Sequence, residues 1–346
     1  MMNRQMQGLL LVFCLATAPL FAQQNAEAVQ YLDAIGKEFQ AVSKNMMSYI
    51  SAAAHSKGAR KVEKKRQELL NQIKEAERNM RRMRPFQNDA SLRDTVVLYL
   101  NMSHTVLNED FGKIIDLEDV AEQSYDAMEA YLLAKELANE KLDQASEMVS
   151  REQNKFTTTH NIKIVENSSK LSQKLEASGK VFKYYNEIYL IFFKSYKDEA
   201  YLMDALQQGD VNQKEQTKNA LLNSATAGLQ KLGPISPFKG DASLKAACQQ
   251  LLNFYKQEAS TGIPQVIDFD LKKENFEKLK KAFDDKRSNE RTQADVDLYN
   301  KTVKEYNEAV GKVNAVHTDL NKKRAQALEQ WNKMTDQFLS RHVPRY

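Results

Sequence analysis

Histidine, cysteine and carboxylate side chains are the groups that most often bind metals or act as acids, bases and nucleophiles. The sequence contains five histidines, namely His55, His104, His160, His317 and His342. None has an aspartate, glutamate, cysteine or second histidine three or four residues away, the spacing that builds metal sites in helical bundles. Motifs for a nucleophilic serine, a phosphate-binding loop and a Cys-x-x-Cys pair are absent from the sequence too. We therefore expect no catalytic residue, no metal site and no cofactor, and a protein that is not an enzyme.

Individual histidine and cysteine residues have structural interpretations. His317 lies on an apolar stripe near Arg324, and we interpret it as a buried residue that contributes packing specificity. His160 and His342 each follow a phenylalanine by four residues, and we expect them at helix C-termini, where a positive charge is favourable. Cys248 stands among alanine and leucine residues and is predicted to be a small buried side chain.

The segment from Lys57 to Arg84 is strongly basic. It holds 11 lysines and arginines against four glutamates, a net charge of +7, whereas residues 209–236 carry only +1. One interpretation is attraction of a polyanion outside the cytoplasm, such as lipopolysaccharide, an acidic glycan or an acidic face of another surface protein. The alternative is a solvated face that is balanced by acidic residues at 118–126. Nucleic acid is not expected, because aromatic residues for base stacking are not interleaved. The candidate contact residues are Lys61, Lys64, Lys65, Arg78, Arg81, Arg82 and Arg84.

An aromatic stretch at residues 182–201 has two interpretations. Tyr185, Tyr189 and Phe193 fall on or beside one face of a predicted helix. Core packing explains such a face, with the tyrosine hydroxyl groups reaching the surface. The alternative is an aromatic pocket of a small-molecule or lipid carrier, or a membrane-surface patch.

These candidate residues are placed by a sequence that repeats itself. The string Pro85–Leu92 returns 152 positions later as Pro237–Leu244 with six of eight residues identical, and residues 41–120 share 17 of 80 positions with 193–272. Further along, the offset becomes 182, so the second copy has gained 30 residues. We infer a tandem duplication and expect the extra residues to form one additional helix with its turn.

Helical periodicity runs through most of the chain. Apolar residues share one helix face from Leu32 to Ala53 and another from Val62 to Met83. On the second face Arg66 occupies one position where an apolar residue is expected. From Tyr299 to Phe338 the apolar positions alternate steps of four and three, which is typical of a coiled coil. Glycine and proline are scarce. These patterns predict an all-α fold: an elongated helical bundle built from two tandem copies of a helical unit, with long coiled-coil-like helices.

The repeated Pro-Phe…Asp-Ala-Ser-Leu element looks like a connection between helices. We expect Pro85 and Pro237 to end one helix, because proline cannot continue the hydrogen-bond ladder. Asp89 and Asp241 should then act as N-caps of the next helix. Asp116 and Asp268 are expected to cap the following helix in the same way.

The N-terminus resembles a secretory signal peptide. One charge, Arg4, precedes an apolar run from Gly8 to Ala22 that is too short to span a membrane. Cleavage after Ala22 would remove Cys14 and leave 49 basic against 46 acidic side chains, a charge of +3. The domain prediction is a signal peptide at 1–22, a first unit at 23–163, a joining segment at 164–183 and a second unit at 184–346.

Three segments carry a resemblance to a known family. The duplicated Pro-Phe…Asp-Ala-Ser-Leu element, the stretch Tyr184–Phe193 and the ending Trp331–Pro344 resemble an uncharacterised family of exported bacterial surface proteins. The resemblance implies an exported helical protein and supplies no catalytic residues. Some such proteins are lipid-anchored, but Phe13 before Cys14 departs from that pattern.

The sequence as a whole therefore predicts an exported protein that is periplasmic, on the outer surface or secreted. Its expected role is that of a macromolecular-binding or structural protein of the cell envelope. The alternative is a carrier that uses the aromatic pocket.

Overall fold

The computed structural model describes residues 23–55, 58–110, 125–163, 169–208 and 211–346. These residues are almost entirely helical, and among them the only β-type pairings are two isolated bridges in loops. The predicted all-α class is therefore confirmed. None of the described helices is both long enough and apolar enough to cross a membrane. The predicted signal peptide at 1–22 lies outside the described residues.

The chain divides into two compact units. The first contains the described residues up to Asn186 together with Gln337–Tyr346, and the second contains Glu187–Asp336. Helices α6 (Lys170–Gln208) and α10 (Gln293–His342) contribute residues to both. The boundary in α6 falls close to the predicted start of the second unit at 184, but the last ten residues belong to the first.

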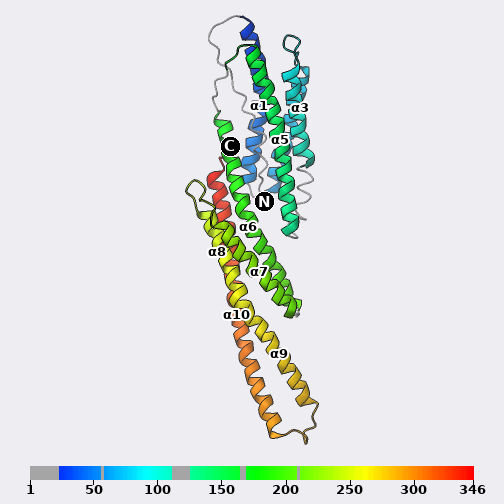
Figure 1. Cartoon of the computed structure of the whole chain (residues 1–346), viewed down its shortest axis with the longest axis vertical. Helices are drawn as coiled ribbons and strands as arrows, with labels where there is room; N and C mark the ends of the chain where they lie inside the picture. Colours follow the sequence, from blue (N-terminus) through cyan, green and yellow to red (C-terminus); the bar gives the residue numbers. More distant parts are fainter. Residues whose placement is uncertain (1–22, 56–57, 111–124, 164–168, 209–210) are drawn as a thin grey trace. The chain divides into compact units, whose positions relative to one another are not determined.

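The first unit is built by helices that pack in chain order. It contains α1 (Gln23–His55), α2 (Ala59–Arg82), α3 (Ser91–Thr105), the π-helical turn η1 (Val106–Asp110) and α5 (Tyr125–Thr159). Helix α2 packs on α1 and α3, and α3 packs on α5, beside which it lies in Figure 1. The predicted apolar faces form this core: Ile35, Ile50 and Ile73 are fully buried.

The second unit contains α7 (Val211–Leu232), α8 (Ser243–Gln257), the π-helical turn η2 (Glu258–Gly262) and α9 (Ile263–Asp284). Helix α7 packs on α8 and α9. The backbone continues from α8 through η2 into α9 without leaving a helical conformation. Asp268 therefore lies inside a helix, where it pairs with Lys272 at 2.5 Å, and its predicted capping role is wrong. Asp116 lies outside the described residues.

Element bounds in the two units correspond at the offset seen in the sequence. Helices α3 and α8 begin and end 152 residues apart, and so do the turns η1 and η2. The preceding loops also match: Phe86 and Asp89 exchange two backbone hydrogen bonds of 3.0 and 2.8 Å, and Phe238 and Asp241 exchange bonds of 3.1 and 2.9 Å. Equal residue types at equal spacing thus produce the same local backbone.

The details of this loop correct two expectations. Helix α2 ends at Arg82 and α7 ends at Leu232, so both helices stop before Pro85 and Pro237 are reached. Asp89 accepts a 2.8 Å hydrogen bond from the Ser91 amide, and Asp241 accepts the equivalent bond from Ser243. Both aspartates stand one residue before the N-cap position, which is an alanine in each copy. They satisfy a free amide of the first turn from outside the helix.

The region in which the sequence predicts 30 additional residues forms a hairpin of two helices. Helix α9, a connection of eight residues and the start of α10 occupy positions 272–321, and Figure 1 shows α9 beside α10. Stacked rings join them: Phe276 lies 4.4 Å from Tyr306 and Phe283 lies 4.4 Å from Tyr299, with ring planes 10° apart in each pair. The counterpart of α9 at the 152-residue offset falls largely on residues 111–124, outside the described ranges, so the additional helix stays a prediction.

Candidate functional site

The candidate contact residues of the basic segment lie on and just after α2. Residues three or four apart share one face of a helix, and Arg60, Lys64, Arg78 and Arg82 follow this spacing along one stripe with Lys74. Lys61 and Arg81 flank the stripe, and Arg84 follows the helix. Of these eight residues, all except Lys74 are exposed. We call the exposed residues Arg60, Lys61, Lys64, Arg78, Arg81, Arg82 and Arg84 the basic face.

Carboxylates of α2 pair with only part of this positive charge. Glu77 accepts hydrogen bonds of 3.0 and 2.8 Å from Arg81, and its other oxygen lies 3.4 Å from Lys74. Glu68 pairs with Lys65 at 2.5 Å. Burial raises the pKa of Glu77, but bonding to Arg81 and the charge of Lys74 outweigh it and leave the pKa lowered. Lys65 and Arg81 are thus engaged within the helix.

A second pairing on α2 holds the helix against its neighbours. Glu63 receives two hydrogen bonds from Arg66, of 2.8 and 2.9 Å, and the same guanidinium donates to the Leu107 carbonyl oxygen at 3.2 Å. Arg66 is 14% exposed, so this arginine on the apolar face serves packing. Its bond to Leu107 ties α2 to the π-helical turn η1.

Six residues of the basic face have no carboxylate within ion-pair distance among the described parts of the chain. They are Arg60, Lys61, Lys64, Arg78, Arg82 and Arg84. The predicted balancing residues Glu118, Asp119 and Glu122 lie outside the described residues. Asp126, at the start of α5, makes no ion pair with a described lysine or arginine.

Helix α7 offers an internal comparison, because it occupies the position of α2 at the 152-residue offset. Lys61, Lys64 and Lys65 correspond to Gln213, Gln216 and Thr217, and the four arginines Arg78, Arg81, Arg82 and Arg84 correspond to Gln230, Gly233, Pro234 and Ser236. None of the seven counterparts is basic. Forming a helix at this place therefore does not require the charge.

The second unit contains a buried charged cluster, of which the sequence pointed only to Arg324. Arg324 of α10 forms ion pairs with Glu199 of α6 and with Glu258 at the start of η2. Glu258 is fully buried and Glu199 is 4% exposed. Arg324 also donates to the Asn321 side-chain oxygen at 2.6 Å. The signal in the sequence was an arginine on an apolar stripe, but its two partners lie 66 and 125 positions away.

The charges of this cluster do not balance. Two carboxylates share one guanidinium, and Oε2 of Glu258 is buried without a hydrogen bond to any described residue. Burial raises the pKa of Glu258 to about 7, although Arg324 lowers it, and nearby Glu199 raises it further. Burial likewise raises the pKa of Glu199 against the effect of Arg324. At neutral pH Glu258 is therefore only partly ionised, so the surplus negative charge is present in only a fraction of the molecules.

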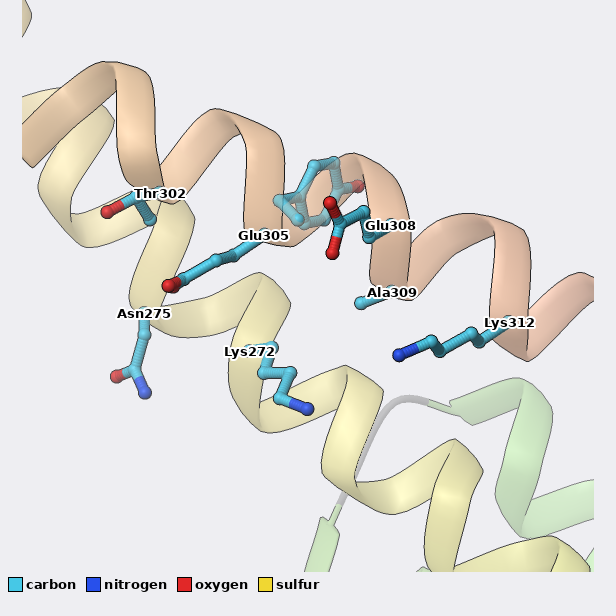
Figure 2. Close-up of a pocket in the computed structure, with 8 residues that line it drawn as sticks. Lys272, Asn275, Thr302, Glu305, Glu308, Ala309 and Lys312 are labelled. Atoms are coloured by element: carbon cyan, nitrogen blue, oxygen red, sulfur yellow. The ribbon is translucent and has the colours of Figure 1, made fainter.

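A groove of about 340 Å³ lies on the α9–α10 hairpin. Figure 2 shows Lys272 on α9 and Glu305, Glu308 and Lys312 on α10 around it. Two lysines and two glutamates give the groove no net charge, so it favours neither cations nor anions. None of its residues was predicted as a site.

The aromatic candidates are part of the packing. Tyr185 is 5% exposed and belongs to the first unit, whereas Tyr189 and Phe193 belong to the second, where their rings stack at 5.7 Å. Phe193 is 2% exposed. In the same unit Phe192 stacks on Trp331 at 4.4 Å.

The positions of three histidines can be compared with their predictions. His317 is exposed, so its predicted burial is wrong: a local pattern marks the stripe but cannot tell where a neighbouring helix covers it. His160 directly follows α5 and His342 ends α10, as predicted. Their ring centroids lie 4.5 Å from that of Phe156 and 4.7 Å from that of Phe338, respectively.

Cys248 is buried, as expected, and burial raises the pKa of its thiol to about 12. Within the described ranges no three histidine, cysteine, aspartate or glutamate side chains gather to form a potential metal site.

Comparisons with known proteins do not assign the chain to a family. No family model, no curated protein and no solved structure matches it. The resemblance to exported bacterial surface proteins therefore stays a prediction, and the candidate site rests on its own chemistry.

Proposed function

We propose that this chain is a non-enzymatic, exported helical protein of the bacterial cell envelope that binds an anionic macromolecule through the basic face of α2. In this proposal residues 1–22 are a signal peptide. The protein works at the outer surface, in the periplasm or after secretion. The two helical units arose by tandem duplication, with coiled-coil-like packing along the longest helices, and one copy then acquired the contact surface.

The observation that carries the proposal is the set of six exposed basic residues on α2 and just after it that have no carboxylate partner in the described structure. Ion pairs within α2 engage Lys65, Arg66 and Arg81 and leave these six available. The corresponding positions of α7 lack them, so the charge does not serve the helical scaffold. Concentrated charge of one sign on a rigid helix attracts oppositely charged polymers and speeds their association.

The test replaces Arg78, Arg81, Arg82 and Arg84 with glutamine and measures binding to immobilised heparin and to lipopolysaccharide at low and high salt. Each exposed charge contact is worth about 0.2–1 kcal/mol, so the four substitutions together should weaken binding by at least about fourfold and make its salt dependence shallower. Glutamine keeps the helix propensity of the replaced residues, and circular dichroism checks that the fold is intact.

A matched control removes the same amount of charge from the other unit. Lys280, Lys281, Lys304 and Lys322 are exposed and lie on α9 and α10. Their replacement by glutamine changes the net charge equally and should leave binding within about twofold. Equal losses in both variants would reduce the interaction to overall charge, and unchanged binding of the α2 variant would refute the proposed contact surface.

A further inference from the structure

The basic face has two separate groups of charge, and their separation points to the kind of partner. The first group, Arg60, Lys61 and Lys64, lies in the first turns of α2, and the second, Arg78, Arg82 and Arg84, lies at and after its end. Lys64 and Arg78 stand 14 positions apart. At 1.5 Å of rise per residue this is about 21 Å along one continuous helix.

The stripe between the two groups is polar and exposed. Gln67 and Asn71 lie on it and are exposed, and Lys74, which is only partly exposed, lies on it paired with Glu77 at 3.4 Å. Gln67 donates to Glu63 at 2.8 Å, and Asn71 makes no side-chain hydrogen bond to a described residue. Amide side chains of this kind can donate to and accept from the hydroxyl groups of a ligand that continues through the gap.

We infer that the basic face binds a linear acidic polysaccharide that runs along α2 and bridges the two charge groups. This inference rests on the proposed function and names the partner class. A single phosphate or one lipid headgroup reaches only one group, since about 21 Å lies between them. A chain that reaches both gains from their combined effect, because the second contact forms at high effective concentration.

The surroundings of the stripe argue against a bilayer as the partner. Helices that lie on membranes bury large apolar side chains next to their basic residues. The large exposed apolar residues of the described chain are Leu98, Leu137, Tyr201, Leu271, Leu298 and Tyr346, and none of them is on α2. Charges and amides therefore make up the exposed stripe, which suits a hydrated polymer.

One acidic residue on α2 should repel an anionic chain that lies along the stripe, so its substitution tests the inference. Glu75 is exposed and has no ion-pair partner among the described residues. It lies three residues before Arg78 on the same side of the helix. Glu75→Gln should tighten binding of a bridging chain about two- to fivefold and leave the helix unchanged.

The experiment compares heparin oligosaccharides with a length below about 15 Å with chains above about 40 Å, using the intact protein. Two triple variants, R60Q/K61Q/K64Q and R78Q/R82Q/R84Q, each remove one charge group. We expect the wild-type protein to bind the long chains about 100-fold more tightly than the short ones. Each triple variant should lose at least tenfold for long chains and only about twofold for short chains.

The outcomes separate the inference from the proposed function. If long and short chains bind equally well and both triple variants still weaken binding, the face binds anions without bridging and the inference is overturned. If a variant with all six substitutions binds like the wild type, the proposed function fails as well. Binding to vesicles of phosphatidylglycerol and phosphatidylcholine, without binding to long heparin chains, would also overturn the inference in favour of a membrane surface.

Discussion

The buried cluster around Arg324 predicts that removing a charge will stabilise the protein. Glu258→Gln keeps the size and shape of the side chain and leaves Glu199 and Arg324 as a neutral ion pair. Truncating one partner of a buried pair usually destabilises strongly, because the other charge stays behind uncompensated. Here two carboxylates share one guanidinium, so the substitution removes the surplus charge.

The magnitude follows from the pKa of Glu258. Burial in the folded protein raises this pKa from 4.5 to about 7. Because the folded-state pKa lies above the unfolded one, stability from this group is fully present below about pH 4.5 and is lost as the pH rises through 7. At about 1.4 kcal/mol per pKa unit, the loss is about 3 kcal/mol above pH 8. The Glu258→Gln protein does not titrate at this position, so its stability should change less with pH.

The assay is urea unfolding at pH 5 and pH 8, followed by the fluorescence of Trp331. This is the one tryptophan of the sequence, it is 3% exposed, and it lies in the second unit beside Phe192. We expect Glu258→Gln to be more stable than the wild type by up to about 3 kcal/mol at pH 8, with the difference falling to about 1 kcal/mol at pH 5. Glu305→Gln, which changes an exposed glutamate of α10, is the matched control and should have no such effect.

Removing the cation instead of a carboxylate tests the same reasoning in the opposite direction. Arg324→Gln leaves Glu199 and Glu258 facing each other without a cation, and we expect a loss of about 3–5 kcal/mol at pH 8 that shrinks at pH 5, where the carboxylates accept protons. The reasoning would be refuted if Glu258→Gln were no more stable than the wild type at pH 8. It would also be refuted if Arg324→Gln lost equal stability at both pH values.

Three further predictions concern packing. Cys248 should not react with a thiol reagent at pH 8 in the folded protein and should react on unfolding, because it is buried and its pKa is about 12. Gly262→Ala places a Cβ 2.9 Å from the side chain of Leu320, so we expect a loss of about 1–3 kcal/mol in urea unfolding, which Leu320→Ala should partly relieve. Phe86→Ala removes a ring that contacts Tyr31 at 5.3 Å and should cost about 3–5 kcal/mol, measured by thermal unfolding; a loss below 1 kcal/mol would contradict the packing described.

What the sequence alone determined is local. The spacing of apolar residues predicted helices and the faces that Ile35, Ile50 and Ile73 bury, because the 3.6-residue period brings residues three or four apart together. The contrast between the basic stripe of α2 and its neutral counterparts in the second unit was also visible, because the charge of a segment can be counted without knowing its contacts.

Tertiary structure decided which stripe positions are covered and by what. His317 and Arg324 follow the same periodic pattern, yet His317 is exposed and Arg324 meets two carboxylates from distant helices. Asp268 was expected to cap a helix but lies inside the continuous helix α9. Local spacing sets the direction in which a side chain points, whereas its neighbours depend on contacts between segments far apart in the chain, and one sequence does not record these.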